Sequence, residues 1–206
     1  MLSDTPKLLG DSGAKAERVG LLREPHIAPL TDYVEKLRIE AGPGAEIPYF
    51  DPWDGGIEAV ALFLLEAPGA KAVSSGFISR NNPDETAKNM FQLCQAAGIG
   101  RKATVLWNVV PWYIGDGKKI RAATPADLEN GLKPLPRLLE LLPQVKTIVL
   151  VGRKAEKARP QICKMKYQVF VSPHPSPLYV NNAPGNREKI LSIFQLVRES
   201  ITEQGA

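Results

Sequence analysis

The chain has 206 residues, with 44% hydrophobic residues, 23% charged residues and a formal net charge of +4 at pH 7. This composition is that of an ordinary soluble protein, and the small positive charge permits an anionic partner without requiring one. No apolar run is long enough for a membrane span and the N-terminus lacks the apolar core of a signal peptide, so we expect a cytoplasmic protein with no membrane partner.

The N-terminal half is predicted to contain two helices and one strand. The first 20 or so residues are expected to be extended or poorly ordered, and residues 25–42 have the apolar spacing of a helix. Residues 57–66, IEAVALFLLE, form a nearly continuous apolar run that is typical of a buried parallel strand. A long loop follows. The next helix is predicted to begin with Asn82 as its N-cap and to run to Gly98.

The C-terminal half is predicted to continue the alternation of strands and helices. The predicted strands are residues 103–112, 146–152 and 167–172, and the predicted helices are residues 124–142, 153–162 and 186–201. A kink is expected in the first of these helices, at its internal prolines. The alternation predicts an α/β fold, a three-layer αβα sandwich with a central, mainly parallel four-stranded sheet, in a single domain over residues 1–206.

The two cysteines, Cys94 and Cys163, form no CxxC pair and are too few for a four-cysteine metal or iron–sulfur site. We therefore expect no metal and no cofactor. Both cysteines are interpreted as packing residues in a reducing compartment.

Polar residues follow the predicted strands at their carboxyl ends, where open α/β sheets bind ligands. The stretches LLEAPG (64–69), LWNVVPW (106–112) and SPHPSPL (172–178) are expected to converge there. The prolines prevent the last stretch from continuing as a strand and hold His174 rigidly. A rigidly held neutral imidazole N–H suits a developing anion, although His174 could instead bind a backbone group.

Single residues in these stretches leave alternatives open. Glu66 either ends a strand in solvent or belongs to a site. Phe77 either fills a satellite core or forms a platform for a base. Asn108 interrupts an apolar strand, and its amide either fixes a neighbouring loop or presents a donor and an acceptor to a ligand.

Taken together, these stretches resemble the uracil-DNA glycosylase superfamily. HPSPL (174–178) is similar to the family's histidine loop with its leucine that enters the duplex, and EAPG (66–69) is similar to its first motif. SGFISR (75–80), with the helix after it, resembles the segment of the stacking phenylalanine. LWNVVPW resembles the strand that carries the base-reading asparagine. The resemblance covers roughly residues 57–195 in the right order.

The resemblance implies a DNA repair enzyme that acts as a monomer and hydrolyses the N-glycosidic bond of uracil in DNA, releasing free uracil and leaving an abasic site. The resemblance also implies a role for each site residue. Catalysis falls to Glu66 and His174, uracil binding to Ala67, Gly69, Phe77 and Asn108, and DNA binding to Ser75, Ser176, Leu178 and Arg187, with Lys118, Lys119 and Arg121 as basic surroundings of the leucine.

Two departures from the family pattern concern the chemistry. The branch that uses EAPG normally carries four cysteines on an iron–sulfur cluster, which this chain cannot supply. The best-known branch has a water-activating aspartate where this chain has Ala67. The water activator is therefore expected to be Glu66, or else Asp51 or Asp54 of the FDPWDGG loop.

Two further function classes stay open at this stage. A non-catalytic binder of uracil-containing or damaged DNA could share the fold, since Ala67 removes one catalytic carboxylate. An enzyme of free nucleotides could share it too, although a wedging Leu178 would have no use there.

Overall fold

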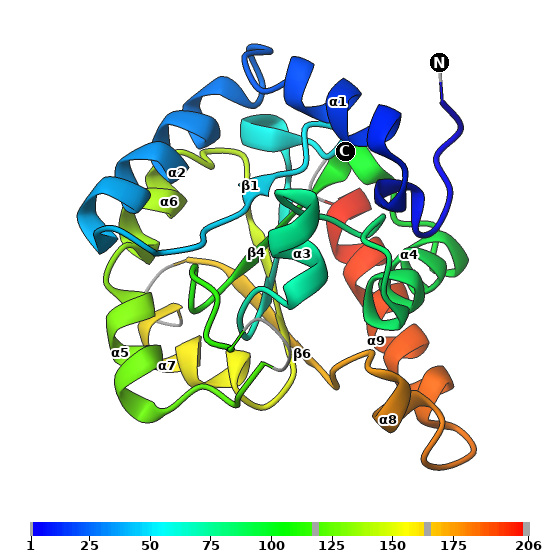
Figure 1. The fold of residues 1–206 in the computed structure, drawn as a ribbon. Coiled ribbons are helices and arrows are strands. Elements are labelled where there is room, and N and C mark those ends of the chain that lie inside the picture. Colours follow the sequence, from blue (N-terminus) through cyan, green and yellow to red (C-terminus); the bar gives the residue numbers. More distant parts are fainter. Residues whose placement is uncertain (1, 117–119, 163–165, 204–206) are drawn as a thin grey trace.

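A parallel four-stranded sheet lies at the centre of the computed structural model, which describes residues 2–116, 120–162 and 166–203 (Figure 1). Its strands are β2 (Ala61–Leu65), β4 (Thr104–Asn108), β5 (Thr147–Val151) and β6 (Gln168–Ser172), in the spatial order β4-β2-β5-β6. Every neighbouring pair in this sheet is parallel. The predicted α/β fold is therefore confirmed.

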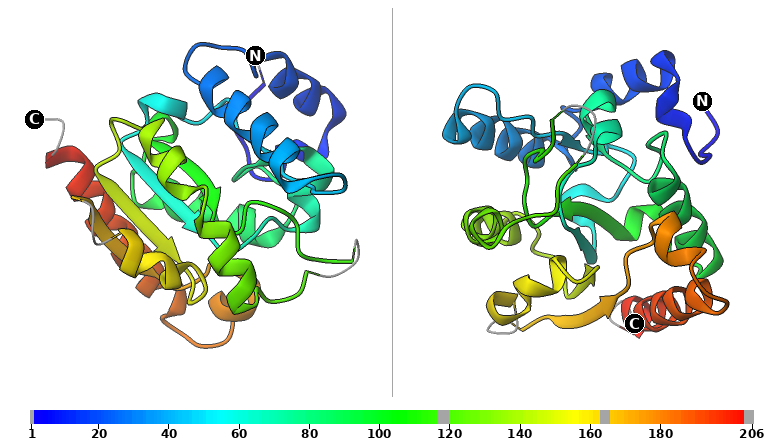
Figure 2. Two further views of the ribbon diagram at one scale, coloured as in Figure 1. Left: turned by 90° about the vertical axis from the view of Figure 1, so that its left-hand side faces the viewer. Right: turned by 60° about the horizontal axis from the view of Figure 1, so that its bottom comes forward.

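Helices cover the sheet on both faces and make the three layers of the predicted sandwich (Figure 2). The helices α4 (Glu85–Ala96) and α9 (Asn186–Glu203) pack against each other, and α9 contacts β5 and β6. The helices α2 (Ala28–Ala41), α5 (Pro125–Leu132) and α6 (Leu135–Glu140) lie across the sheet from them. The predicted helix over residues 124–142 thus breaks in two, because Pro134 cannot continue α5.

The central strands are apolar because helices bury them on both sides. Every residue of β4 and β5 is buried. On one face the ring of Phe63 meets the edge of Phe194 from α9, with 5.3 Å between ring centroids. On β4, Trp107 stacks on Phe50 with centroids 4.0 Å apart, which makes this tryptophan a core residue.

The expectation that the first 20 or so residues are extended or poorly ordered is wrong. They form the short helix η1 (Leu8–Gly10) and the helix α1 (Ser12–Gly20), which is N-capped by Asp11. Arg18 is 0% exposed, and its Nε donates a hydrogen bond to Asp51 at 2.8 Å. An arginine that would be read as a surface residue instead anchors this segment.

The long loop predicted after β2 contains two elements that the sequence analysis missed. They are α3 (Ala70–Ser75) and β3 (Phe77–Ile78), which pairs in parallel with β1 (Tyr49–Phe50). The following helix α4 has Asp84 and not Asn82 as its N-cap. Asn82 cannot cap it because its amide donates to the Phe77 carbonyl at 2.9 Å and accepts from the Ser75 hydroxyl.

Short helices make up the other connections: η2 (Gly56–Glu58), η3 (Arg101–Ala103), η4 (Ala155–Ala158), α7 (Arg159–Ile162) and α8 (Pro177–Val180). The last lies in the proline-rich stretch, which was not expected to be helical. Pro177 permits this single turn because the first position of a helix needs no N–H donor. No helix in the described part of the chain is both long and apolar enough to cross a membrane.

Candidate active site

A cavity of about 570 Å³ lies at the carboxyl edge of the sheet. Glu66 from the end of β2, Asn108 from the end of β4 and His174 from the loop after β6 all line it, so the three strand ends meet as expected. A larger hollow of about 710 Å³ beside α2 and α6 contains none of these three residues. The remaining walls of the first cavity come from residues Leu65, Ala67, Pro68, Gly69, Ala70, Lys71, Ala72, Ile78, Ser79, Arg80, Asn82, Asp84, Thr86, Ala87, Met90, Leu106, Ile120, Arg121 and Ala122.

Asn108 presents an unpaired donor to this cavity. It is the last residue of β4, lies opposite Leu65 of β2 in the sheet register, and is only 4% exposed. Its Nδ2 has no hydrogen-bond partner among the described residues. A buried polar group without a partner costs about 1–3 kcal/mol, so a ligand acceptor at this position would be bound favourably.

His174 is held by its loop and by the strand beside it. Asn89 of α4 donates a hydrogen bond from Nδ2 to the carbonyl of Pro175 at 2.9 Å, which ties the loop to the helix. Gly152, at the end of β5 with φ +90°, lies directly against the imidazole, and a Cβ there would come within 3.4 Å of Cδ2. Burial lowers the pKa of His174 below 6.5, against the opposing effect of Glu66 and Asp84. The ring is therefore neutral at physiological pH.

Glu66 is fixed by the loop that follows β4. Its Oε1 accepts a hydrogen bond from the backbone N–H of Ala123 at 2.7 Å. The carbonyl of Ala123 in turn accepts a hydrogen bond from Lys154 Nζ at 2.6 Å. Gly69 also lines the cavity, and there is free space beside it, because a Cβ built on this glycine would meet nothing within 4 Å.

A family model described as the Uracil DNA glycosylase superfamily matches residues 52–198, a span that includes every residue lining the cavity. The chain belongs to the uracil DNA glycosylase superfamily. Among solved structures, it is similar to the solution NMR structure of a candidate uracil DNA glycosylase from Methanosarcina acetivorans. The two sequences are 18% identical, the matched region covers 68% of this chain and 91% of that chain, and the TM-score of the superposition is 0.46. A search of curated proteins finds no match.

Phe77 does not take the place that the resemblance to the glycosylase superfamily implied. Its ring is 1% exposed and packs with Leu9 and Leu22 in a satellite core. Successive residues of a strand point to opposite faces, so in β3 the next residue, Ile78, lines the cavity instead. The assignment of Phe77 as the ring that stacks on a base is therefore contradicted, and its alternative as a core residue holds.

The predicted DNA-binding residues fall into two groups. Ser75 is buried and its hydroxyl donates to Asn82 Oδ1 at 2.6 Å, so it cannot contact a phosphate and this assignment is wrong. In contrast, Leu178 on α8 is 83% exposed, and Ser176 N-caps that short helix. Arg187 lies in the first turn of α9, 3.5 Å from Gln92 Oε1. All four residues lie within residues 52–198, the segment that matches the glycosylase superfamily.

The basic surroundings of Leu178 are only partly described. Lys118 and Lys119 lie outside the described residues. Arg121 lines the cavity, and its guanidinium donates to the Asp127 carboxylate, with Nη2 and Oδ1 3.0 Å apart.

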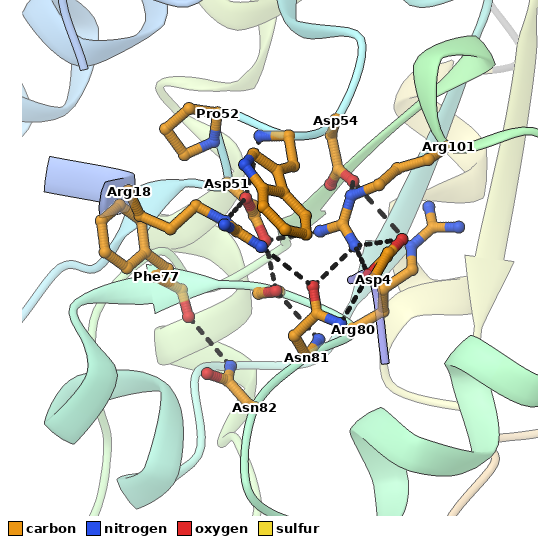
Figure 3. Close-up of polar contacts among 12 residues, drawn as sticks. Asp4, Arg18, Asp51, Pro52, Asp54, Phe77, Arg80, Asn81, Asn82 and Arg101 are labelled. Atoms are coloured by element: carbon orange, nitrogen blue, oxygen red, sulfur yellow. Dashed lines mark hydrogen bonds and ion pairs between the residues drawn. The ribbon is translucent and has the colours of Figure 1, made fainter. Parts of the chain in front are cut away.

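Asp51 and Asp54 do not face the cavity, which contradicts their expected availability as water activators. Both are 1% exposed, in a network that Figure 3 shows. Arg101 donates to Asp51 at 2.5 Å and lies 2.9 Å from Asp54. Burial would raise the pKa of Asp51, but Arg101 and Arg18 overcome it and the pKa is lowered. For Asp54, burial prevails and raises the pKa to about 6.

Asp84 is a cavity residue that no sequence pattern indicated. Asp84 lines the cavity just before α4, and its negative charge raises the pKa of His174. With Asn82 predicted as the N-cap, Asp84 would lie in the first turn of the helix, where an acidic residue is common and indicates no site. The signal that could have revealed it is that this helix follows SGFISR in the stretch resembling the superfamily.

The residues do not fit an iron–sulfur cluster of the kind found in the EAPG branch. The chain contains two cysteines, of which Cys94 is buried and Cys163 lies outside the described residues. Within the described ranges, no three histidine, cysteine or acidic side chains gather as metal ligands.

Proposed function

We propose that this chain is a DNA repair glycosylase that hydrolyses the N-glycosidic bond of uracil in DNA, releasing free uracil and leaving an abasic site. The observation that carries the proposal is the unpaired, buried Nδ2 donor of Asn108 in one cavity with a neutral His174 and the carboxylate of Glu66. Superfamily membership supports it. A base in a duplex cannot reach such a cavity, so the nucleotide must first be flipped out of the stack.

Asn108 selects the base. Its Nδ2 donates to the O4 acceptor of uracil, and an amide can accept from N3–H at the same time. Cytosine presents a donor where uracil has O4, so it would leave two donors opposed. Ile78, Met90 and Leu106 give the cavity an apolar lining that suits the faces of the ring.

His174 stabilises the leaving group. As the C1′–N1 bond breaks, its electron pair passes to the uracil ring and negative charge builds on O2. A neutral imidazole donates an N–H to that oxygen, and the interaction strengthens only as the charge develops. Glu66 supplies negative charge that offsets the cationic sugar. Its Ala123 hydrogen bond holds it in place.

The exposed side chain of Leu178 supports duplex DNA as the substrate. An exposed leucine on a short helix can enter the gap that the flipped nucleotide leaves, as apolar wedges do in other DNA-binding proteins. Ser176 and Arg187 are available to nearby phosphates, and the positive net charge favours them. Open space at Gly69 leaves room for a substituent, so slow action on 5-substituted uracils in mismatches is expected beside uracil itself.

The experiment is an excision assay on a labelled duplex with one uracil, incubated with the purified protein and then treated with alkali. Cleavage at the uracil, with none in a thymine control duplex, supports the proposal. The variant His174→Ala should lose the chemical step far more than DNA binding. Binding without cleavage by the wild type would favour the non-catalytic alternative.

A further inference from the structure

Asp84 is the second carboxylate of the cavity that contains Glu66 and His174. It comes from a different part of the fold, since it directly precedes α4 whereas Glu66 directly follows β2. The negative charge of each carboxylate raises the pKa of His174, and the effect of Glu66 is larger than that of Asp84. The described cavity lining contains no further acidic residue. With Asp51 and Asp54 held by arginines elsewhere, Asp84 is the remaining acid that can act there besides Glu66.

The surroundings of Asp84 affect its basicity, which matters for proton transfer. Burial raises the pKa of Asp84, although the N–H groups of Ala87 and Thr86 oppose the effect. Its charged neighbours are Glu85 on the same helix and Lys7 from the N-terminal segment. A carboxylate with a raised pKa is a stronger base, and therefore better suited to take a proton from water.

We propose that Asp84 is a catalytic residue that accepts the proton of the attacking water, an inference that rests on the proposed glycosylase function. One water O–H bond breaks and its proton passes to Asp84. The hydroxide oxygen bonds to C1′ while the C1′–N1 bond breaks and its electron pair leaves with uracil. The proton on Asp84 is then returned to solvent. Glu66 has the separate role of offsetting the positive charge of the sugar.

Asp84 also has a structural role, which the test must separate from catalysis. Its Oδ1 accepts the backbone N–H of Ala87 at 2.9 Å as the N-cap of α4. Asparagine caps a helix about as well as aspartate, so Asp84→Asn removes the charge and keeps the cap. Asp11 provides a matched control, because it caps α1 through Ala14 N–H at 2.8 Å and lies outside the cavity.

The first measurement is the single-turnover rate of uracil excision between pH 5 and pH 8 for both variants. Asp84→Asn should lower the rate by about 100-fold or more and remove the fall in rate on the acid side, since a general base contributes roughly 10²- to 10⁴-fold. Asp11→Asn should stay within about twofold of the wild type, because asparagine and aspartate cap equally well. An Asp84→Asn rate within about threefold of wild type, or an equal loss in both variants, overturns the proposal.

The second measurement needs no turnover and so separates this proposal from the proposed function. The pKa of His174 is followed by NMR, with its signal assigned by loss in His174→Gln. Because the charge of Asp84 raises this pKa, Asp84→Asn should lower it and Asp11→Asn should leave it unchanged. An unchanged pKa in Asp84→Asn overturns the placement of Asp84 beside His174. A wild type that excises no uracil, with the pKa lowered in Asp84→Asn, would instead contradict the proposed function.

Discussion

Gly152 and His174 are in direct contact, and the contact leaves little room for a side chain on Gly152. A Cβ at this position would lie 3.1 Å from His174 Cβ. Gly152 directly follows β5 and His174 follows β6, so the pairing of these two neighbouring strands brings the loop and the glycine together. The glycine thus determines where the imidazole can lie.

Gly152→Ala should therefore displace His174 and reduce uracil excision by about tenfold or more, because small misplacements of a catalytic group are costly. The backbone at Gly152 has a φ of +90°, which is unfavourable for the alanine that replaces it. Gly185→Ala controls for that strain, since Gly185 has a φ of +83° with nothing within 4 Å of the new Cβ. Single-turnover rates and thermal unfolding of both variants make the comparison. Equal rates in the two would show that the contact with His174 is unimportant.

Asn108→Asp should weaken excision by about 10- to 100-fold, because it opposes a carboxylate to O4 of uracil and leaves a buried charge without a partner. Asn130→Asp makes the same change of charge on the exposed side of α5, where Asn130 accepts from Lys133. The quantity to compare is kcat/KM on a uracil duplex. If Asn108→Asp keeps the wild-type value, Asn108 does not read the base.

His174 should be more than half neutral at pH 6.5, because burial lowers its pKa in the folded protein below that value. The neutral imidazole that the mechanism needs is then lost only below that lowered pKa. Glu66→Gln should lower the pKa further, since the charge of Glu66 raises it. NMR titration of the two histidines, His26 and His174, measures both effects. A His174 pKa at or above 6.5 in the wild type contradicts this description of the site.

Arg18→Met should destabilise the protein by about 3–5 kcal/mol, because it leaves Asp51 as a buried charge with one partner fewer. Arg23→Met is the matched control, since Arg23 pairs with Asp32 and Glu35 at the surface. That loss should be much smaller, because ion pairs between exposed side chains contribute little to stability. Urea unfolding gives both free energies. Similar losses for the two variants would mean that the N-terminal segment contributes little through its buried arginine.

Parallel strands made much of the candidate site predictable. Glu66, Asn108 and His174 each follow an apolar run, and strands of a parallel sheet end at one edge. Phe77 could not be placed in the same way, because whether it or Ile78 faces the cavity depends on the pairing of a two-residue strand with β1. Arg18 was missed because its buried partner, Asp51, lies 33 residues away in sequence.

Local signals also competed with one another before α4. Asn82 and Asp84 are both good N-cap residues, and the sequence pattern favoured the first. Contacts outside the helix determine which residue caps it, because the amide of Asn82 is hydrogen-bonded to the Ser75 hydroxyl and the Phe77 carbonyl. Asp84 therefore caps the helix and reaches the cavity, which no helix-start pattern could indicate.

The central claim is that this chain releases uracil as a free base from DNA. Its most direct test is a mass balance on a duplex containing one labelled uracil, in which free uracil and abasic sites are both quantified by mass spectrometry after incubation with the purified protein. We predict equal amounts of the two products, with none from His174→Ala in the same time. Tight binding of the duplex with no free uracil, or release of base from free deoxyuridine nucleotides alone, would contradict the account.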